Sequence, residues 1–248
     1  MNSVELQELE IFYPESDGKP MADNTLQWDW MVKIVGELRE LFVSQNVFIA
    51  GDLFWYPVQG DPKTVIAPDA LVVFGRPPGR RGSYKQWLED NIPPQVVFEV
   101  LSPSNTTAEM EEKLLFYQTH GVEEFYIIDP EFPHAEGFVR QRNKLVPIAE
   151  IHGHVSPLLN IRFQLDDELK LFTPDNREFQ NREERTGQLI DEIRLTQAER
   201  YLEQQRAEQE YERAEQALRE LEQERLRTAK HLERLRQLGA TDVEEMQG

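Results

Sequence analysis

The chain has 248 residues, of which 39% are hydrophobic and 10% aromatic, enough for one sizeable core and an appendage. It has no cysteine, which excludes disulfides, thiolate nucleophiles and cysteine-ligated zinc. Its formal net charge of −19 at pH 7 argues against binding to nucleic acid by bulk electrostatics, because phosphate contacts require Lys and Arg.

The apolar runs are shorter than about ten residues, whereas a helix that spans a bilayer needs roughly 20. The first ten residues lack the basic and apolar regions of a secretory signal. We therefore expect a cytoplasmic protein without membrane contact.

Any basic surface must be local, because residues 1–173 carry 27 acidic and only 14 basic side chains. Two stretches gather positive charge, a loop over 75–85 and a hairpin-like segment over 137–146. Their members are Arg76, Arg80, Arg81 and Lys85 in the loop, and Arg140, Arg142 and Lys144 in the hairpin. Both are typical of solvated turns, and either could instead contact DNA.

The first predicted element is a helix that begins near residue 24. Apolar residues at 26, 30, 31, 34, 38, 41 and 42 repeat with helical spacing, and Asn24 or Thr25 can cap the helix. The next two apolar runs, 46–57 and 65–74, are separated by the turn-like sequence VQGDPKT. They predict a hairpin of two strands.

A strand–helix–strand unit is predicted over 94–129. In the strand PQVVFEVLSPS, a period of two places Val97, Glu99 and Leu101 on one face. Ser104 or Asn105 can cap the following helix, which Gly121 ends. A crossover of this length places the next strand, EEFYIID, parallel to the first. Short strands are expected in FVRQR, LVPIA and RFQLD.

The composition changes near residue 181 to Glu, Gln, Arg, Leu and Ala, with no Gly or Pro between Gly187 and Gly239. This pattern predicts a long helix over 181–238. A heptad frame from Ile190 to Leu235 has five polar residues among its fourteen core positions. The alternatives are a coiled coil, which would join copies of the chain or a partner protein, and a helix that folds back or stays exposed.

The sequence thus divides into a globular domain over 1–175, a helical tail over 181–238 and a flexible C-terminus over 239–248. Two acidic residues of the domain, Asp69 and Glu99, lie inside apolar strand sequences. A charge there is costly unless it binds a metal, a partner or a substrate.

Two carboxylates on neighbouring strands repel each other unless a cation lies between them, and hard oxygen ligands suit Mg²⁺ or Mn²⁺. Such an ion polarises a phosphoryl oxygen and activates its bound water. Lys113, in the predicted crossover helix, adds a positive charge that can orient the water or stabilise charge on the phosphate. These three residues predict phosphodiester hydrolysis.

The same residues carry a resemblance. The PD dipeptide at 68–69, EVLSPSN at 99–105 and KLLFYQTHGVEEFYIIDP at 113–130 are similar to the Uma two family of restriction-endonuclease-like proteins, of the PD-(D/E)xK superfamily. The resemblance covers about residues 10–170. It implies an α/β (α+β-like) core with a central mixed sheet flanked by helices. It also implies that Asp69 and Glu99 are the two acidic residues of the motif.

One position departs from the superfamily pattern. The motif lysine normally follows the acidic residue by two positions, and here that position is Leu101. In this family the lysine has moved to the following helix, where Lys113 is at the matching place. Each of the three residues also has a purely structural interpretation. Lys113 could be an exposed helix lysine paired with Glu109, Asp69 could accept a hydrogen bond from the backbone, and Glu99 could pair with an arginine.

Three further residues are weaker candidates. Glu37 can supply the helix carboxylate that many superfamily members use, and Asp52 can add a third carboxylate or simply form a turn. Tyr117 shares a helix face with Lys113, so it positions the lysine or packs. We therefore expect an endonuclease that cuts DNA with Mg²⁺ or Mn²⁺. The alternative is a catalytically silent nuclease-fold protein that assembles through residues 181–238.

Overall fold

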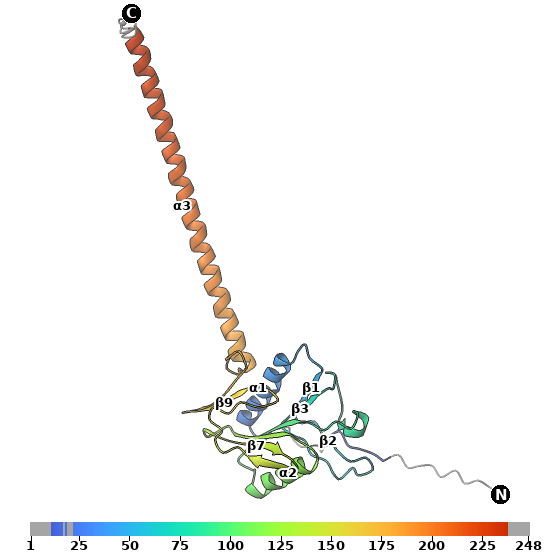
Figure 1. Cartoon of the computed structure of the whole chain (residues 1–248). Helices are drawn as coiled ribbons and strands as arrows, with labels where there is room; N and C mark the ends of the chain where they lie inside the picture. Colours follow the sequence, from blue (N-terminus) through green and yellow to red (C-terminus); the bar gives the residue numbers. More distant parts are fainter. Residues whose placement is uncertain (1–10, 17, 19–21, 238–248) are drawn as a thin grey trace, which may run out of the picture. The chain divides into compact units, whose positions relative to one another are not determined.

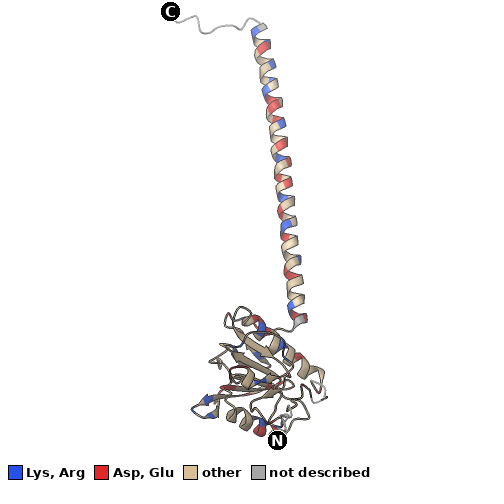
Figure 2. Ribbon diagram, turned by 90° about the vertical axis from the view of Figure 1, so that its right-hand side faces the viewer, with Lys and Arg blue, Asp and Glu red and all other residues tan. Residues whose placement is uncertain are grey.

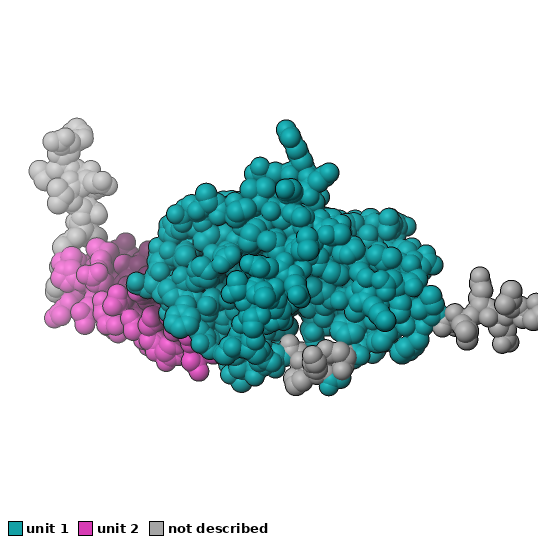
Figure 3. All heavy atoms as spheres, turned by 90° about the horizontal axis from the view of Figure 1, so that it is seen from below, with its two compact units in different colours: residues 1–185 teal, residues 186–248 magenta. Residues whose placement is uncertain are grey.

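The structure, a computed structural model, describes residues 11–16, 18 and 22–237 (Figure 1). The chain forms two compact units, residues 1–185 and 186–248 (Figure 3). The first unit is a mixed α/β domain, and the described part of the second is helical. The expected flexible C-terminus over 239–248 lies outside the described residues.

A mixed sheet of six strands forms the centre of the first unit. Its spatial order is β1 (Val47–Ala50), β3 (Ala70–Phe74), β5 (Val96–Val100), β6 (Glu124–Asp129), β7 (His134–Gln141) and β8 (Lys144–Pro147). β5 and β6 are parallel, as the crossover predicts, and the other neighbours are antiparallel. The predicted fold class, a central mixed sheet flanked by helices with a long C-terminal helix, is confirmed.

α1 (Thr25–Leu41) covers one face of the sheet. It begins at the predicted cap, where the Asn24 side chain accepts a hydrogen bond from Gln27 N. Its buried stripe includes Gln27 and Met31, whereas Leu26 is 38% exposed. The buried face of the helix is therefore rotated slightly from the one that the apolar pattern predicts, because Gln27 rather than Leu26 is buried.

α2 (Thr107–Thr119) covers the other face of the sheet (Figure 1). Thr106 caps it, so the predicted caps are wrong. The side chain of Asn105 instead accepts a hydrogen bond from Ser102 N, at 2.8 Å. Gly121 adopts φ +94° just beyond the last turn, which is the left-handed ending that a glycine allows.

The alternation of β5 decides which side chains meet each helix. Phe98 and Val100 face the α1 side, whereas Val97 and the following Leu101 face the α2 side. Glu99 shares this second face, as the period of two predicts.

The remaining strands form two small sheets. β2 (Trp55–Tyr56) pairs in parallel with β4 (Tyr84–Lys85), which a short 3-10 helix, η1 (Gln86–Leu88), follows. β9 (Arg162–Leu165) and β10 (Leu169–Phe172) form an antiparallel hairpin. The predicted strand over 46–57 is interrupted after Ala50, and Asp52 takes a left-handed φ of +48°.

α3 (Arg182–Gln237) is the predicted long helix, and residues 186–236 of it are exposed. Acidic and basic residues are interspersed along the helix (Figure 2). The beginning of α3, up to Arg185, belongs to the first unit. In the part of the chain that the structure describes, no helix combines the length and the apolar character needed to cross a membrane.

A buried carboxylate fixes the loop that follows β8. Glu124 is 1% exposed and accepts hydrogen bonds from the hydroxyls of Tyr126 and Ser156 and from Leu158 N. Burial raises the pKa of Glu124, and these hydrogen bonds only partly offset the shift.

We predict that Glu124→Ala lowers the free energy of unfolding by about 2–4 kcal/mol, because it leaves three buried donors without their acceptor. Urea denaturation followed by circular dichroism measures the loss. The adjacent Glu123, whose side chain is 48% exposed, provides the control, and Glu123→Ala should change stability by less than about 0.5 kcal/mol. Equal losses of unfolding free energy in Glu124→Ala and Glu123→Ala would contradict the stabilising role of the Glu124 hydrogen bonds.

Candidate functional site

The candidate site lies where the beginning of β3, the end of β5 and α2 meet. The β3–β5 register pairs Ala70 with Phe98, so Asp69 stands opposite Glu99. Oδ2 of Asp69 also accepts a hydrogen bond from Val100 N, at 2.6 Å. The two acidic residues that the sequence singles out are therefore direct cross-strand neighbours.

Both oxygens of Glu99 are engaged by side chains of α2. Oε2 accepts a hydrogen bond from Lys113 Nζ at 2.8 Å, and Oε1 accepts one from the Tyr117 hydroxyl. Glu99 is 1% exposed, whereas the Lys113 side chain is 20% exposed. The structure thus brings Lys113 to Glu99, although the two residues are 14 positions apart.

The two partners of Glu99 come from one helical face, because residues four apart in α2 lie one turn above each other. Tyr117 is fully buried, with its ring stacked on Trp55 at 6.4 Å and tilted against Phe125 at 4.9 Å. This aromatic wall leaves the Tyr117 hydroxyl little freedom, and it excludes water from one side of Glu99.

Charge repulsion and burial determine the protonation of the site. Burial, together with the neighbouring charge of Glu99, raises the pKa of Asp69 well above its usual value of 3.8. Burial alone would lower the pKa of Lys113, but the charge and hydrogen bond of Glu99 outweigh it and the pKa is raised. Burial and then Glu99 raise the pKa of Tyr117. Lys113 is thus an ammonium and Tyr117 a neutral phenol, and both act as donors.

The donor set fits a hard divalent cation. Within the described residues, no group of three or more His, Cys, Asp or Glu side chains is placed to hold a metal. Asp69 and Glu99 offer two carboxylates that repel each other. Mg²⁺ commonly uses one or two carboxylates and completes its shell with water and phosphate oxygens, so the residue types fit this ion, while Lys113 and Tyr117 bind the Glu99 oxygens in the metal-free protein.

Two residues near the site carry no motif signal. Gln27 of α1 donates from Nε2 to the carbonyl oxygen of Val100 at 3.0 Å, and Asp23 accepts from the hydroxyls of Ser102 and Ser104. They tie the chain after Glu99 to the beginning of α1. The sequence contains one clue to the contact of Gln27: this residue lies four positions before Met31, on the helical face that the structure buries.

Glu37 takes another role, so its prediction as the helix carboxylate of the site is corrected. It is 1% exposed on the α1 face of the sheet, and it binds Arg177, Arg185 and Gln180 N. These contacts attach residues 177–185 to α1. Asp52 lies in the turn after β1, where its N–H donates to Pro68 O at 3.0 Å, and its left-handed backbone is that of the turn alternative.

The two predicted basic clusters use most of their arginines inside the protein. Arg76 and Arg81 bind Glu89, and Arg140 donates to the carbonyl oxygens of Val122 and Gln118. These three arginines stabilise turns, whereas Arg80, Arg142 and Lys144 remain exposed.

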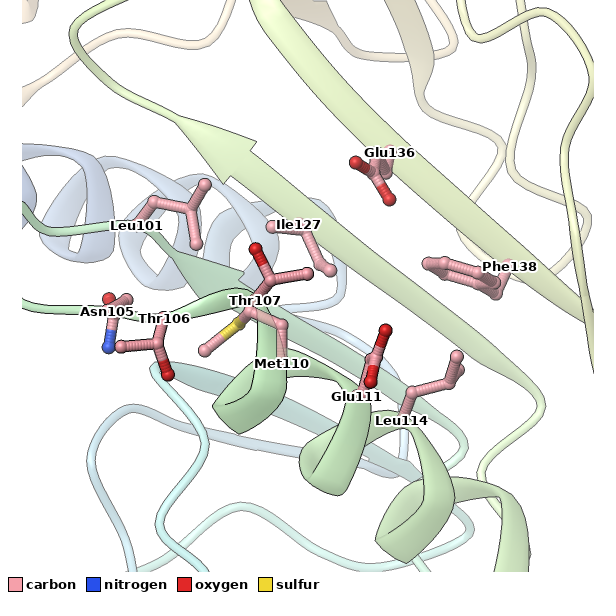
Figure 4. Close-up of a pocket in the computed structure, with 10 residues that line it drawn as sticks. All are labelled: Leu101, Asn105, Thr106, Thr107, Met110, Glu111, Leu114, Ile127, Glu136 and Phe138. Atoms are coloured by element: carbon pink, nitrogen blue, oxygen red, sulfur yellow. The ribbon is translucent and has the colours of Figure 1, made fainter.

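A hollow beside α2 is separate from the acidic pair. It has a volume of about 400 Å³, and Met110, Leu114, Ile127 and Phe138 form much of its lining, with Glu111 on α2 opposite the strands (Figure 4). Asp69, Glu99 and Lys113 do not line it. The geometry around Glu99, rather than the size of this hollow, identifies the candidate site.

A family model matches residues 10–168, more than half of the chain. It is the model of Uma2, the Uma two family named above, and its description is "Putative restriction endonuclease". The chain belongs to this family. Membership of Uma2 supports nuclease function, and the match covers Asp69, Glu99, Lys113 and Tyr117.

A solved structure with a similar arrangement is a "putative nuclease belonging to DUF820" from Anabaena variabilis ATCC 29413. The two chains are 17% identical, with a TM-score of 0.42, and the similarity covers 56% of the present chain and 75% of the other. No curated protein matches the sequence.

We predict that Asp69→Asn stabilises the metal-free protein at neutral pH. The raised pKa of Asp69 means that the folded state binds its proton more tightly than the unfolded state does. Its contribution is complete below the usual pKa of 3.8 and is lost as pH rises through the folded value. The variant should therefore melt a few degrees higher than wild type at pH 8.

The gain in melting temperature should shrink toward pH 4. Asp61→Asn is the control, since Asp61 is an acid of the 57–64 loop whose pKa is lowered by its hydrogen bond from Thr64. If wild type melted at a higher temperature than Asp69→Asn at pH 8, the unfavourable ionisation of Asp69 in the folded protein would be contradicted.

Proposed function

We propose that the protein is an Mg²⁺- or Mn²⁺-dependent endonuclease that hydrolyses phosphodiester bonds of DNA. One observation carries this proposal: Asp69 stands opposite Glu99 across two strands, and Glu99 is bound by Lys113. Two carboxylates and an ammonium within one site supply the groups that phosphodiester hydrolysis needs without a covalent nucleophile. The Uma2 match supports the same reaction class.

Asp69 and Glu99 would hold the cation. When bound, a divalent ion polarises a phosphoryl oxygen and lowers the pKa of a bound water. The repulsion that raises the pKa of Asp69 in the metal-free protein then becomes attraction for the ion. Binding requires Asp69 to release its proton, so affinity should rise with pH.

Lys113 and Tyr117 act as hydrogen-bond donors in this proposal. The raised pKa of Lys113 keeps it protonated, which excludes it as a general base while it binds Glu99. As an ammonium it can orient the attacking water or stabilise negative charge on the phosphate. Tyr117 holds the Glu99 carboxylate in a fixed orientation from within the aromatic wall.

The acidity of the chain limits how DNA can be held. With a net charge of −19, the protein gains little from general phosphate attraction, and three arginines of the basic clusters, Arg76, Arg81 and Arg140, already bind other groups of the protein. Specific contacts close to the acidic pair therefore have to supply the binding free energy.

We predict that Asp69→Asn and Lys113→Ala each lower Mn²⁺-dependent plasmid nicking by at least about 100-fold, because each removes a group that acts on the reacting phosphate. Calorimetric titration separates their roles. Asp69→Asn should lose Mn²⁺ binding, whereas Lys113→Ala should keep it, since an ammonium repels the ion.

Lys63→Ala and Asp61→Asn, which alter a loop lysine and a loop aspartate, are the matched controls. Both should cut at the wild-type rate, and circular dichroism establishes that all four variants fold. Undiminished nicking by Asp69→Asn would overturn the proposal.

A second role, assembly through α3, is favoured by the apolar side chains that this helix exposes. Ile190, Ile193, Leu218, Leu221 and Leu235 lie at the core positions of the heptad frame and are 38–65% exposed. An apolar stripe of this kind on a helix is typically buried against another helix, because its exposure to water costs free energy. We propose that α3 joins copies of the chain as a coiled coil, whether or not the domain cuts DNA.

We predict that the double variant Leu218→Glu, Leu221→Glu dissociates this assembly, because two charges per chain would enter its core. Sedimentation velocity should show an oligomer for wild type and a monomer for the variant. Leu226→Glu is the matched control, since Leu226 is 62% exposed but lies outside the core positions. A monomeric wild-type protein, or equal masses for all three, would refute the coiled coil.

A further inference from the structure

A small groove runs along the exposed face of α1. Trp28, Val32, Val35, Gly36 and Arg39 form one wall, since positions i, i+4, i+7, i+8 and i+11 share a helical face. The turn Gly51–Asp52 forms the other wall. Its volume is about 280 Å³, below the roughly 300–1,000 Å³ of drug-sized ligand pockets and suited to one ring system.

Both walls of the groove connect to the acidic pair. Asp52 N donates to Pro68 O, the residue directly before Asp69, and Gln27, directly before Trp28, donates to the carbonyl oxygen next to Glu99. Asp69, Glu99 and Lys113 do not line the groove. It lies on the α1 side of the sheet, where Gly51 packs closely against the backbone oxygen of Asp69.

The chemistry of the groove matches a nucleotide. Trp28 is 41% exposed at one end and offers a flat aromatic face. At the other end, Arg39 is exposed and is fixed by two hydrogen bonds from Nε and Nη2 to Ile49 O, at 3.1 and 3.0 Å. An aromatic platform near a fixed guanidinium is the combination that binds a base and its backbone phosphate.

We propose that this groove binds one unpaired nucleobase of the substrate strand, so that the enzyme acts on single-stranded or locally unpaired DNA. The inference rests on the proposed function and adds its substrate class. Stacking on Trp28 supplies binding that the acidic chain cannot obtain from phosphates alone. An apolar peptide would fit the middle of the groove but would offer no negative charge to the exposed Arg39.

Two variants test the groove independently. Trp28→Ala removes the platform, whereas Gly36→Leu fills the groove, because a Cβ at Gly36 meets no atom within 4 Å. The backbone of Gly36 is helical, so leucine favours the fold there. Phe132→Ala is the matched control, since it removes another exposed aromatic, 65% exposed, from a turn.

Fluorescence anisotropy with labelled oligothymidine, in the absence of metal and with the full chain, measures binding. Wild type and Phe132→Ala should bind the single strand more tightly than a duplex of the same length. Trp28→Ala should bind it about 5- to 150-fold more weakly, the range for the loss of one stacked base, and Gly36→Leu should also be weakened. Equal binding by wild type and Trp28→Ala, or a preference for duplex, would overturn the inference.

Mn²⁺ calorimetry on the same proteins separates this inference from the proposed function. Trp28→Ala and Gly36→Leu should bind Mn²⁺ as wild type does, because neither touches the carboxylates. If wild type binds Mn²⁺ and no oligonucleotide, the groove inference is wrong and the metal site stands. If oligonucleotide binding depends on Trp28 but Mn²⁺ does not bind, the groove stands and the nuclease proposal fails.

Discussion

The close approach of Asp69 and Glu99 is the constraint on which the rest of the site depends. Two carboxylates at directly opposite positions of neighbouring strands repel each other, and burial adds to the cost. The protein offsets this cost with a backbone hydrogen bond to Asp69 and with Lys113 and Tyr117 on Glu99. Such a pair is a poor way to stabilise a sheet, since apolar residues would pack there at no electrostatic cost. Its retention is understandable if a cation completes it.

Strand register, the crossover connection and the helical repeat each position a different residue of the site. The antiparallel register of β3 and β5 sets Asp69 against Glu99, and the parallel crossover from β5 to β6 lays α2 across the same face of the sheet. The helical repeat then aligns Lys113 with Tyr117. On the other face, α1 fixes the end of β5 through Gln27, and the ion pairs of Glu37 attach residues 177–185. Glu99 is thus held within β5, and Asp69 lies directly before β3 and is fixed by its hydrogen bond from Val100 N, which favours a preorganised site.

Family membership and site geometry support the same reaction class, whereas the net charge of the chain limits how a nucleic acid can be held. Membership of Uma2 and the two carboxylates support phosphodiester hydrolysis. The negative charge of the chain and the paired arginines disfavour attraction to a duplex backbone. Stacking of an unpaired base in the α1 groove, as proposed above, would supply binding without a large basic surface.

The sequence by itself determined the three long helices, the strands of the central sheet, their order and the identity of the acidic pair. Apolar periodicity and the crossover length were sufficient because they are local, and the cost of a carboxylate in an apolar strand marked Asp69 and Glu99. The family resemblance marked Lys113. Only the tertiary structure decided that Glu37 binds Arg177 and Arg185, that Thr106 caps α2 and that Gln27 is buried. Those outcomes depend on which distant side chains meet, and residue spacing along the chain does not encode such long-range contacts.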